Sequence, residues 1–224
     1  MIDRCLPHCC EAITRRTSKK NLLLLLSLAK CHPHNVSPHS RRSSNCPPLS
    51  PSDKVFFCNS GAEANESAIK LSRKWASSKG ATHPIIIAAK GSFHGRTLGA
   101  LAATGQDKYH QGFKHGSEVV PGFAHVPYND IGALRKAFKE CNTRTISDRV
   151  KGRKRAVAAV LVEAIQGEGG IIPGDKKFFE AARELCDEHG ALLICDEVQV
   201  SAGLMGAQLS FFMDWDISKS LRDS

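Results

Sequence analysis

The sequence lacks three features that would place the chain in other classes of protein. None of its nine cysteines belongs to a CxxC pair and their spacing is irregular, so the sequence predicts no zinc site. No apolar run approaches the roughly 20 residues that a transmembrane helix needs, which argues against a membrane partner. No internal repeat is present. What remains, with 42% hydrophobic and 24% charged residues, is typical of a globular chain in a reducing compartment.

Acidic residues are scarce in residues 1–52. Two acids stand there against eight Lys or Arg, which accounts for six of the nine net positive charges of the chain. The apolar block Leu22–Leu26 follows four of these basic residues. Such a block resembles a secretory hydrophobic region or an organelle transit peptide, and the acid-poor composition favours transit. A segment without leader function is the third reading. We expect residues 1–52 to be a leader or linker, with a mitochondrial or other organellar location, and cytoplasmic otherwise.

A second basic cluster lies at residues 149–155 and is expected to be a solvated loop. Because most of the positive charge belongs to the leader and to this loop, the net charge does not predict a nucleic-acid partner.

From Lys54 onward, apolar strand patterns alternate with helical ones, which predicts an α/β fold with a mostly parallel sheet and helices on both faces. We assign residues 53–200 to this core. Reduced Cys58 and Cys195 are expected to pack in its strands as small hydrophobes. The expected strands are Val55–Cys58, Pro84–Ala89, Val157–Val162 and Ala191–Cys195, and the expected helices are Ala62–Ser77, Thr97–Thr104, Asn129–Cys141 and Lys176–His189.

The stretch ALLICDEVQ, residues 191–199, is an apolar run that ends in carboxylates and an amide. Ligands of open α/β sheets bind beyond the carboxyl ends of the strands. Asp196 can pair with a protonated heterocyclic nitrogen, Val198 can pack on a ring face, and Gln199 can bond a ring oxygen. The alternative is a strand that simply ends in a polar loop.

Three further loops follow predicted strands. Ser60, Gly61 and Ala62 open a helix whose free N–H groups suit a phosphate, although a Ser cap completed by Glu63 explains the same residues. In the second loop, Phe93 can stack on a ring, His94 can act as a base, and Arg96 can hold a carboxylate. A core Phe, a structural His and a surface Arg are the alternatives. In the third, Glu163 and Gln166 precede glycines that let a ligand approach, or belong to a flexible loop.

Five stretches together resemble the class III pyridoxal-phosphate aminotransferases, and within them the acetylornithine aminotransferases. They cover about residues 54–200, in the order KVFFCNSGAEANESAIKLSRKW, GSFHGRTLGALAATGQDKY, PGFAHVPYND, VEAIQGEGGIIPG and LLICDEVQ. The resemblance implies the fold of type I enzymes of this class, a homodimer, and amino transfer from N-acetylornithine to 2-oxoglutarate in arginine biosynthesis.

The resemblance also implies roles for individual residues. The backbone of Gly61 and Ala62 matches the phosphate-binding positions, and Phe93 matches the ring-stacking aromatic. Arg96 matches the arginine that binds the substrate carboxylate, while Glu163 and Gln166 match residues that line the active site. Asp196 matches the partner of the pyridine nitrogen, with Val198 and Gln199 beside it.

Residues 201–224 depart from the family pattern. Arg222 stands where the spacing from the Asp216-Ile217 pair places the Schiff-base lysine, and Lys219 lies three residues too early. A guanidinium stays protonated and cannot replace that amine. We therefore expect little or no turnover from this chain alone. The alternatives are a catalytically inactive cofactor-binding protein, one that forms a heterodimer with a full-length relative, and a truncated gene product.

Overall fold

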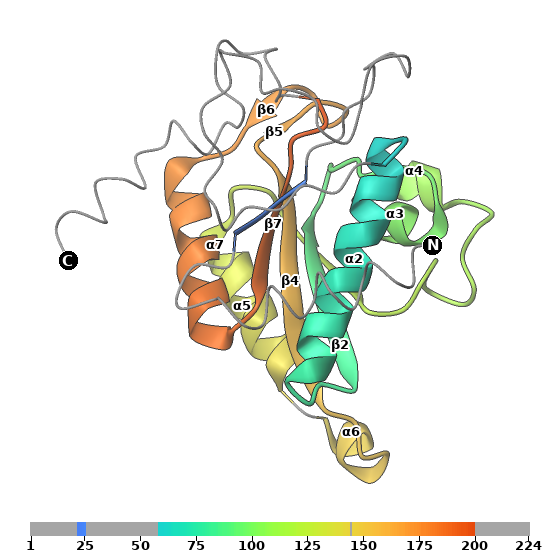
Figure 1. The fold of residues 1–224 in the computed structure, drawn as a ribbon, viewed down its shortest axis with the longest axis vertical. Helices are drawn as coiled ribbons and strands as arrows, with labels where there is room; N and C mark the ends of the chain where they lie inside the picture. Colours follow the sequence, from blue (N-terminus) through green and yellow to red (C-terminus); the bar gives the residue numbers. More distant parts are fainter. Residues whose placement is uncertain (1–21, 26–57, 144, 200–224) are drawn as a thin grey trace, which may run out of the picture.

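The computed structural model describes residues 58–143 and 145–199, together with the backbone of residues 22–25 (Figure 1). Strands and helices alternate along most of this part of the chain, as the sequence predicts. In chain order the elements are β1 (Leu22–Leu25), α2 (Gly61–Ser78), β2 (His83–Ala89), α3 (Leu98–Ala103), α4 (Asp107–His110), β3 (Phe123–Val126), α5 (Ile131–Asn142), α6 (Ile146–Val150), β4 (Arg155–Glu163), β5 (Ile165–Gln166), β6 (Ile172–Pro173), α7 (Lys176–His189) and β7 (Leu192–Asp196).

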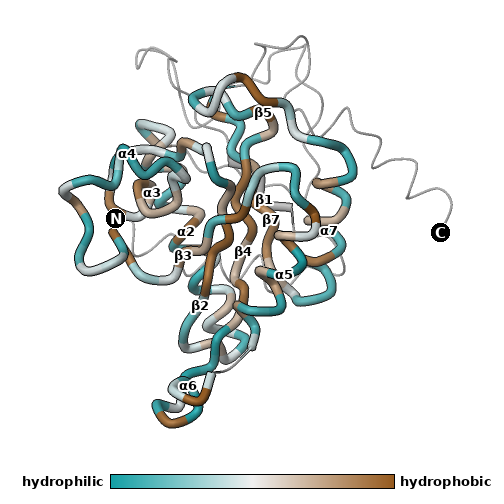
Figure 2. The backbone as a smooth tube through the Cα atoms, turned by 180° about the vertical axis from the view of Figure 1, so that it is seen from behind, coloured by the Kyte–Doolittle hydropathy of each residue, from teal (hydrophilic) through white to brown (hydrophobic). Residues whose placement is uncertain are grey.

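The main sheet has five strands in the order β1-β7-β4-β2-β3, and every neighbouring pair is parallel. Parallel strands covered on both faces are continuous apolar runs rather than alternating ones. Accordingly β7 is buried throughout, and the last seven residues of β4 are buried. Figure 2 shows these apolar segments running through the middle of the molecule. The predicted parallel α/β sheet is confirmed.

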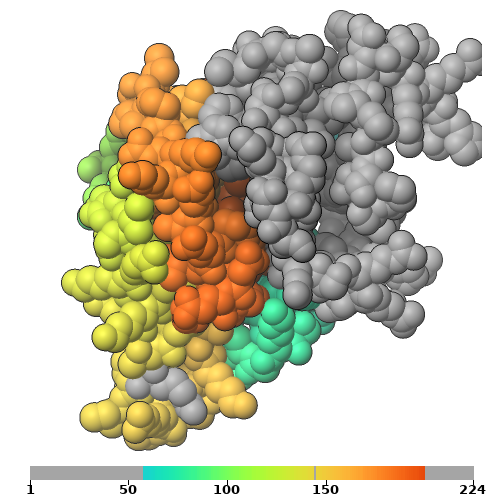
Figure 3. All heavy atoms as spheres, turned by 90° about the vertical axis from the view of Figure 1, so that its left-hand side faces the viewer, coloured from blue at the N-terminus to red at the C-terminus, as the bar shows by residue number. Residues whose placement is uncertain are grey.

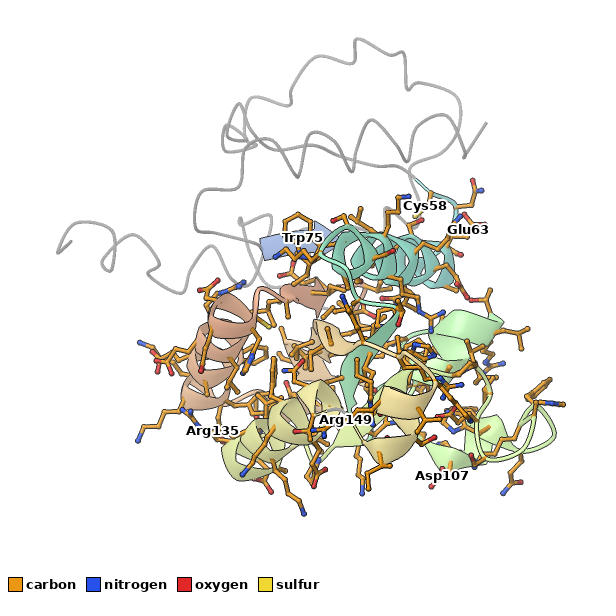
Figure 4. All side chains as sticks on the ribbon, turned by 90° about the horizontal axis from the view of Figure 1, so that it is seen from below. Cys58, Glu63, Trp75, Asp107, Arg135 and Arg149 are labelled. Carbon is orange, nitrogen blue, oxygen red and sulfur yellow. The ribbon has the colours of Figure 1, made fainter. Side chains whose placement is uncertain are left out.

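Helices cover both faces of the sheet. Phe138 of α5 and Phe178 of α7 belong to a buried cluster with Val160 of β4 on one face. Ile69 and Trp75 of α2 pack with Ile86 of β2 and other strand residues on the opposite face. Figure 4 shows α2 on one side of the strands and α5 and α7 on the other, and Figure 3 shows α5 beside α7 on the outer surface. No helix in the described residues is long and apolar enough to cross a membrane.

Local chemistry explains where the helices begin and end. Asp130 caps α5, because its carboxylate accepts the N–H of Ala133 at 2.8 Å. The α7 helix ends at Gly190, whose φ of 65° lies in the left-handed region that glycine adopts without strain. The end of α7 agrees with the sequence prediction, whereas α5 begins two residues after the predicted Asn129.

Some short elements differ from the prediction. β3 is a four-residue strand that the sequence analysis did not assign, although the stretch is part of a family motif. The basic cluster at residues 149–155 is not only a loop, because Arg149 lies in α6 and Arg155 is the first residue of β4. Most of the predicted strand Val55–Cys58 lies outside the described residues, and Cys58 itself belongs to no strand.

The apolar block predicted as the centre of a leader also takes part in the sheet. The backbone of Leu22–Leu25 pairs with β7 in parallel, from Leu22 opposite Leu193 to Leu25 opposite Asp196. A short apolar run has no period that separates a strand from a hydrophobic leader region, so the sequence alone did not reveal this pairing.

The chain leaves two neighbouring strands toward opposite faces. After β2 it continues to α3, whose Ala103 packs on the α2 face, whereas after β4 it continues to α7 on the other face. Between such strands the connections diverge and leave a crevice at the carboxyl edge, where α/β proteins bind ligands. The carboxyl edge of β2, β4 and β7 is therefore where a ligand site is expected.

Candidate functional site

Asp196 is the last residue of β7 and lies opposite Glu163, the last residue of β4. Only 5% of Asp196 is exposed. Its Oδ2 accepts a hydrogen bond from the side-chain amide of Asn65 at 2.8 Å and lies 2.8 Å from Nδ1 of His94. Its Oδ1 accepts the N–H of Val198 at 3.0 Å. Residues from α2, the loop after β2 and the end of β7 thus meet at one buried carboxylate.

Burial alone would raise the pKa of the Asp196 carboxyl. The hydrogen bond and charge interaction with His94, together with the bonds from Asn65 and the Val198 N–H, outweigh it and lower this pKa below its ordinary value. Asp196 therefore stays ionised within the protein, as the partner of a protonated heterocycle must.

Glu163 has the opposite shift. Burial raises the pKa of its carboxyl, and the nearby Asp196 adds to this, while His94 and the Phe93 N–H oppose it. Its Oε1 accepts the N–H of Phe93 at 2.9 Å, and Oε2 lies 3.4 Å from the N–H of Gly167. Glu163 therefore joins the loop after β2 to the loop after β4.

The amino end of α2 faces the same edge. The Ser60 hydroxyl accepts the N–H of Glu63 at 3.2 Å, which confirms the Ser cap, while the Glu63 carboxylate accepts the N–H of Asn59 at 2.8 Å and not that of Ser60. The N–H groups of Gly61 and Ala62 have no acceptor among the described residues. Figure 4 shows Glu63 beside Cys58 at one end of α2, away from Trp75.

Two glycines allow this helix end to approach the loops. A Cβ on Gly61 would lie 2.9 Å from both γ carbons of Val198, and a Cβ on Gly95 would lie 2.7 Å from the Cβ of Ala62. The first turn of α2 therefore packs directly on the exit of β7 and on the His94-Gly95 turn. The predicted phosphate-binding backbone and the Asp196 carboxylate therefore lie on adjoining segments.

Phe93 and Arg96 share an aromatic neighbour that the sequence analysis did not single out. The half-buried Phe93 ring meets the edge of Tyr109 at a centroid distance of 5.4 Å. The exposed Arg96 places its guanidinium carbon 5.7 Å from the centre of the same Tyr109 ring. Arg96 forms no ion pair with a described residue, so its charge is available to an anionic group.

Gln166 and Gln199 differ in their surroundings. Gln166 is buried, its amide donates to the Lys90 carbonyl at 2.9 Å, and its amide oxygen lies where a Cβ on Gly91 would come within 2.9 Å. Gln199 is exposed, and its amide oxygen lies against Gly167. Gln166 thus joins two loops, whereas the exposed Gln199 contacts only the loop after β4 among the described residues.

Asn65 is a site residue that was not among those predicted from the sequence. An asparagine inside a helix is unfavourable unless its side chain has a specific partner, and that is the one signal the sequence offers. Lys219 and Arg222 lie outside the described residues, so their predicted placement is not tested.

A hollow of about 420 Å³ lies elsewhere, at the amino ends of β2, β3 and β4. Arg73, Arg153 and Arg155 are among its lining residues, and none of the predicted site residues is. The candidate site is instead the carboxyl edge around Asp196.

Comparison with known proteins identifies relatives of this arrangement. The family model Aminotransferase class-III matches residues 10–217. The acetylornithine aminotransferase of Thermosynechococcus vestitus is 53% identical over 156 residues, which cover 69% of this chain and 35% of that protein. The acetylornithine aminotransferase of Gloeobacter violaceus is 51% identical over 158 residues, which cover 70% of this chain and 35% of that protein. The chain thus spans about a third of the length of the curated relatives that it matches.

Solved structures agree with the sequence relatives. The ornithine aminotransferase from Toxoplasma gondii, reported with partial occupancy of pyridoxal phosphate at its active site, has a TM-score of 0.53 and 36% identity, covering 64% of this chain and 31% of that one. A Bacillus anthracis aminotransferase has a TM-score of 0.50 and 32% identity, and the match covers 65% of this chain and 33% of that one. The matched family range begins inside the predicted leader and ends inside the predicted divergent tail, so both boundaries remain predictions. The chain belongs to the class III aminotransferases, a family that depends on pyridoxal phosphate.

Proposed function

We propose that this chain binds pyridoxal 5'-phosphate at the carboxyl edge of β2, β4 and β7. The observation that carries the proposal is the Asp196 carboxylate, buried yet kept ionised by Asn65, His94 and the Val198 N–H. A buried anion without a permanent cation suits a ligand that brings its own positive charge. The protonated ring nitrogen of the cofactor is such a group.

The other described residues fit the remaining parts of this cofactor. The free N–H groups of Gly61 and Ala62, at a helix N-terminus, suit its phosphate. Phe93 supplies an aromatic surface, and Val198 an apolar one beside Gly61. Ser60 uses its hydroxyl to cap α2, so its contribution to the phosphate site is mainly to fix the helix end.

When bound, the cofactor would supply an electron sink for reactions at the carbon that bears the transferred amino group. The residues of the chain then hold and orient it. Asp196 keeps the ring nitrogen protonated, and Glu163 fixes the Phe93 loop through a 2.9 Å hydrogen bond. Gln166 fixes the strand-end loops to each other, and the exposed Gln199 is the candidate for the ring oxygen.

The reaction class that we infer is transfer of the amino group of N-acetylornithine to 2-oxoglutarate, a step of arginine biosynthesis. Arg96 is the candidate for the substrate carboxylate, because it is exposed and lies over Tyr109 beside Phe93. The identity of 53% with an acetylornithine aminotransferase supports this substrate class.

Whether the chain turns over substrate by itself is a separate proposal. The match of Arg222 to the lysine position, with Lys219 three residues early, supports little or no turnover. A second function follows from the same residues: an inactive cofactor-binding subunit that pairs with a full-length relative, in place of the family homodimer. The acid-poor residues 1–52 support delivery to a mitochondrion or another organelle.

Cofactor binding is tested by titrating the purified chain with pyridoxal phosphate and following absorbance and tryptophan fluorescence. Asp196→Asn keeps the side-chain shape but removes the charge, so affinity should fall by about 10- to 100-fold. The matched control is Asp187→Asn, in an exposed ion pair with Arg183 on α7. Equal binding by wild type and Asp196→Asn would refute the proposed ring contact.

Turnover is tested by glutamate formation from N-acetylornithine and 2-oxoglutarate. The expected rate for the chain alone is close to background. Co-expression with a full-length acetylornithine aminotransferase, followed by affinity capture of either chain, tests the heterodimer. Recovery of homo-oligomers alone would exclude the heterodimer.

A further inference from the structure

The side-chain amide of Asn65 donates two hydrogen bonds from a single nitrogen. One goes to the backbone carbonyl of His94 and the other to Oδ2 of Asp196, both at 2.8 Å. Asn65 lies in the second turn of α2 and is 2% exposed. It therefore connects the phosphate-binding helix, the loop after β2 and the end of β7 at one buried point.

The two oxygens of Asp196 are not equivalent. Oδ2 already accepts from Asn65 and from His94, which occupies both lone pairs of that oxygen. Oδ1 accepts only the N–H of Val198 among the described residues and retains one lone pair. A further donor that approaches Asp196 therefore finds its acceptor at Oδ1.

We propose that Asn65 is a positioning residue, which occupies Oδ2 of Asp196 and so leaves Oδ1 as the oxygen that receives the cofactor ring N–H. This inference rests on the proposed binding of pyridoxal phosphate. It assigns Asn65 a role that the sequence motif did not indicate.

Helix propensity does not explain the presence of Asn65 at this position. Asparagine is a poor residue for the interior of a helix, and the Oδ1 of Asn65 is buried without a partner among the described residues. A small apolar residue would fill this turn without leaving a buried acceptor. The two hydrogen bonds that its amide donates, to the His94 carbonyl and to Asp196, therefore account for the side chain.

The first test uses the chain without cofactor and follows the carboxyl carbon of Asp196 by ¹³C NMR during a pH titration. The titratable groups around Asp196 are His94 from the loop after β2, Glu163 from β4, and the flanking Cys195 and Glu197. Removal of a donor to the ionised form should move the Asp196 titration to higher pH in Asn65→Leu and in the smaller Asn65→Ala.

The matched control is Asn142→Leu. The Asn142 side chain also makes a hydrogen bond, a partly buried one in which its Oδ1 accepts the Val157 N–H at 2.9 Å, but at the opposite end of the sheet. The control should leave the Asp196 titration unchanged. An unchanged titration in both Asn65 variants would overturn the inference, even if the chain binds no cofactor.

The second test compares pyridoxal phosphate with its carbocyclic analogue, in which a C–H replaces the ring nitrogen. Asn65→Leu should bind pyridoxal phosphate on the order of tenfold more weakly than wild type, and the analogue within about twofold. A merely structural role would weaken both ligands equally, and that result would overturn the inference. Failure of wild type to bind either ligand would instead refute the proposed function and leave the titration to decide the role of Asn65.

Discussion

Glu163 and Asp196 occupy paired positions at the ends of β4 and β7, and the pKa values of their carboxyl groups are displaced in opposite directions. Asp196 accepts hydrogen bonds from three segments. Glu163 accepts hydrogen bonds from two backbone N–H groups only and lies near the Asp196 carboxylate. Two acids in one site thereby acquire different tasks: a permanent anion and a group that is more easily protonated.

Glu163→Gln should change the pH dependence of stability. Because the folded-state pKa of Glu163 is raised, the protonated side chain contributes stability that is present below about pH 4 and is lost as the pH rises through that raised pKa. Gln does not titrate, so the stability of the variant relative to wild type should increase from pH 4 to pH 7. Urea midpoints across this range measure it, with the exposed Glu180→Gln on α7 as control. Parallel curves for wild type and Glu163→Gln would contradict the prediction.

Gly95→Ala should destabilise the fold by about 2–4 kcal/mol, because it combines a backbone penalty with overpacking. Gly95 has a φ of 126°, and its added methyl would meet Ala62 at 2.7 Å. Gly80→Ala is the matched control, since Gly80 has a φ of 87° with nothing within 4 Å of the new methyl. Its expected cost is about 1–2 kcal/mol. Chemical unfolding measures both, and equal costs would show that the contact with α2 is unimportant.

Glu66→Ala should loosen the start of α3. The Glu66 carboxylate accepts the Thr97 hydroxyl at 2.6 Å, the Gly99 N–H at 2.8 Å and the Ala100 N–H at 3.1 Å. Loss of these bonds should accelerate hydrogen exchange at the Gly99 and Ala100 amides by about tenfold. Glu66→Gln keeps an acceptor oxygen and should have a smaller effect. Unchanged exchange in Glu66→Ala would mean that α3 does not depend on this contact.

Much of the fold follows from local patterns in the sequence. The α7 helix and its Gly190 end, and the buried strands β2, β4 and β7, are specified by apolar periodicity and by turn residues within a few positions. The four residues of β3 carry too little pattern to be assigned. Their place is set by the pairing with β2, which is a long-range interaction.

The site shows the same division. Asp196 and Glu163 could be proposed as site residues because each ends an apolar strand in a parallel sheet. Asn65 could not, because its partner Asp196 lies 131 residues away in the sequence. The family motif predicted that Gln166 lines the active site. Its hydrogen bond to the Lys90 carbonyl could not be predicted, because it forms only in the folded chain.

Cysteine labelling should separate the described thiols by burial. Cys141, Cys186 and Cys195 are buried, whereas Cys58 is partly exposed beside the α2 cap. Burial raises the pKa of Cys186 to about 12 and that of Cys195 well above its ordinary value, so few reactive thiolates form there. With iodoacetamide at pH 8, Cys186 and Cys195 should react at least about a hundredfold more slowly than Cys58.

Peptide mass mapping identifies the labelled positions, and labelling in concentrated urea provides the control in which all four thiols react alike. Burial also raises the pKa of the Cys58 thiol, but less surface is lost there and access remains. Because Cys195 precedes Asp196 on β7, its protection also reports whether the carboxyl edge of the sheet is formed in solution. Native-state labelling of Cys195 at the rate of Cys58 would mean that β7 is not packed as described, and the Asp196 site would fall with it.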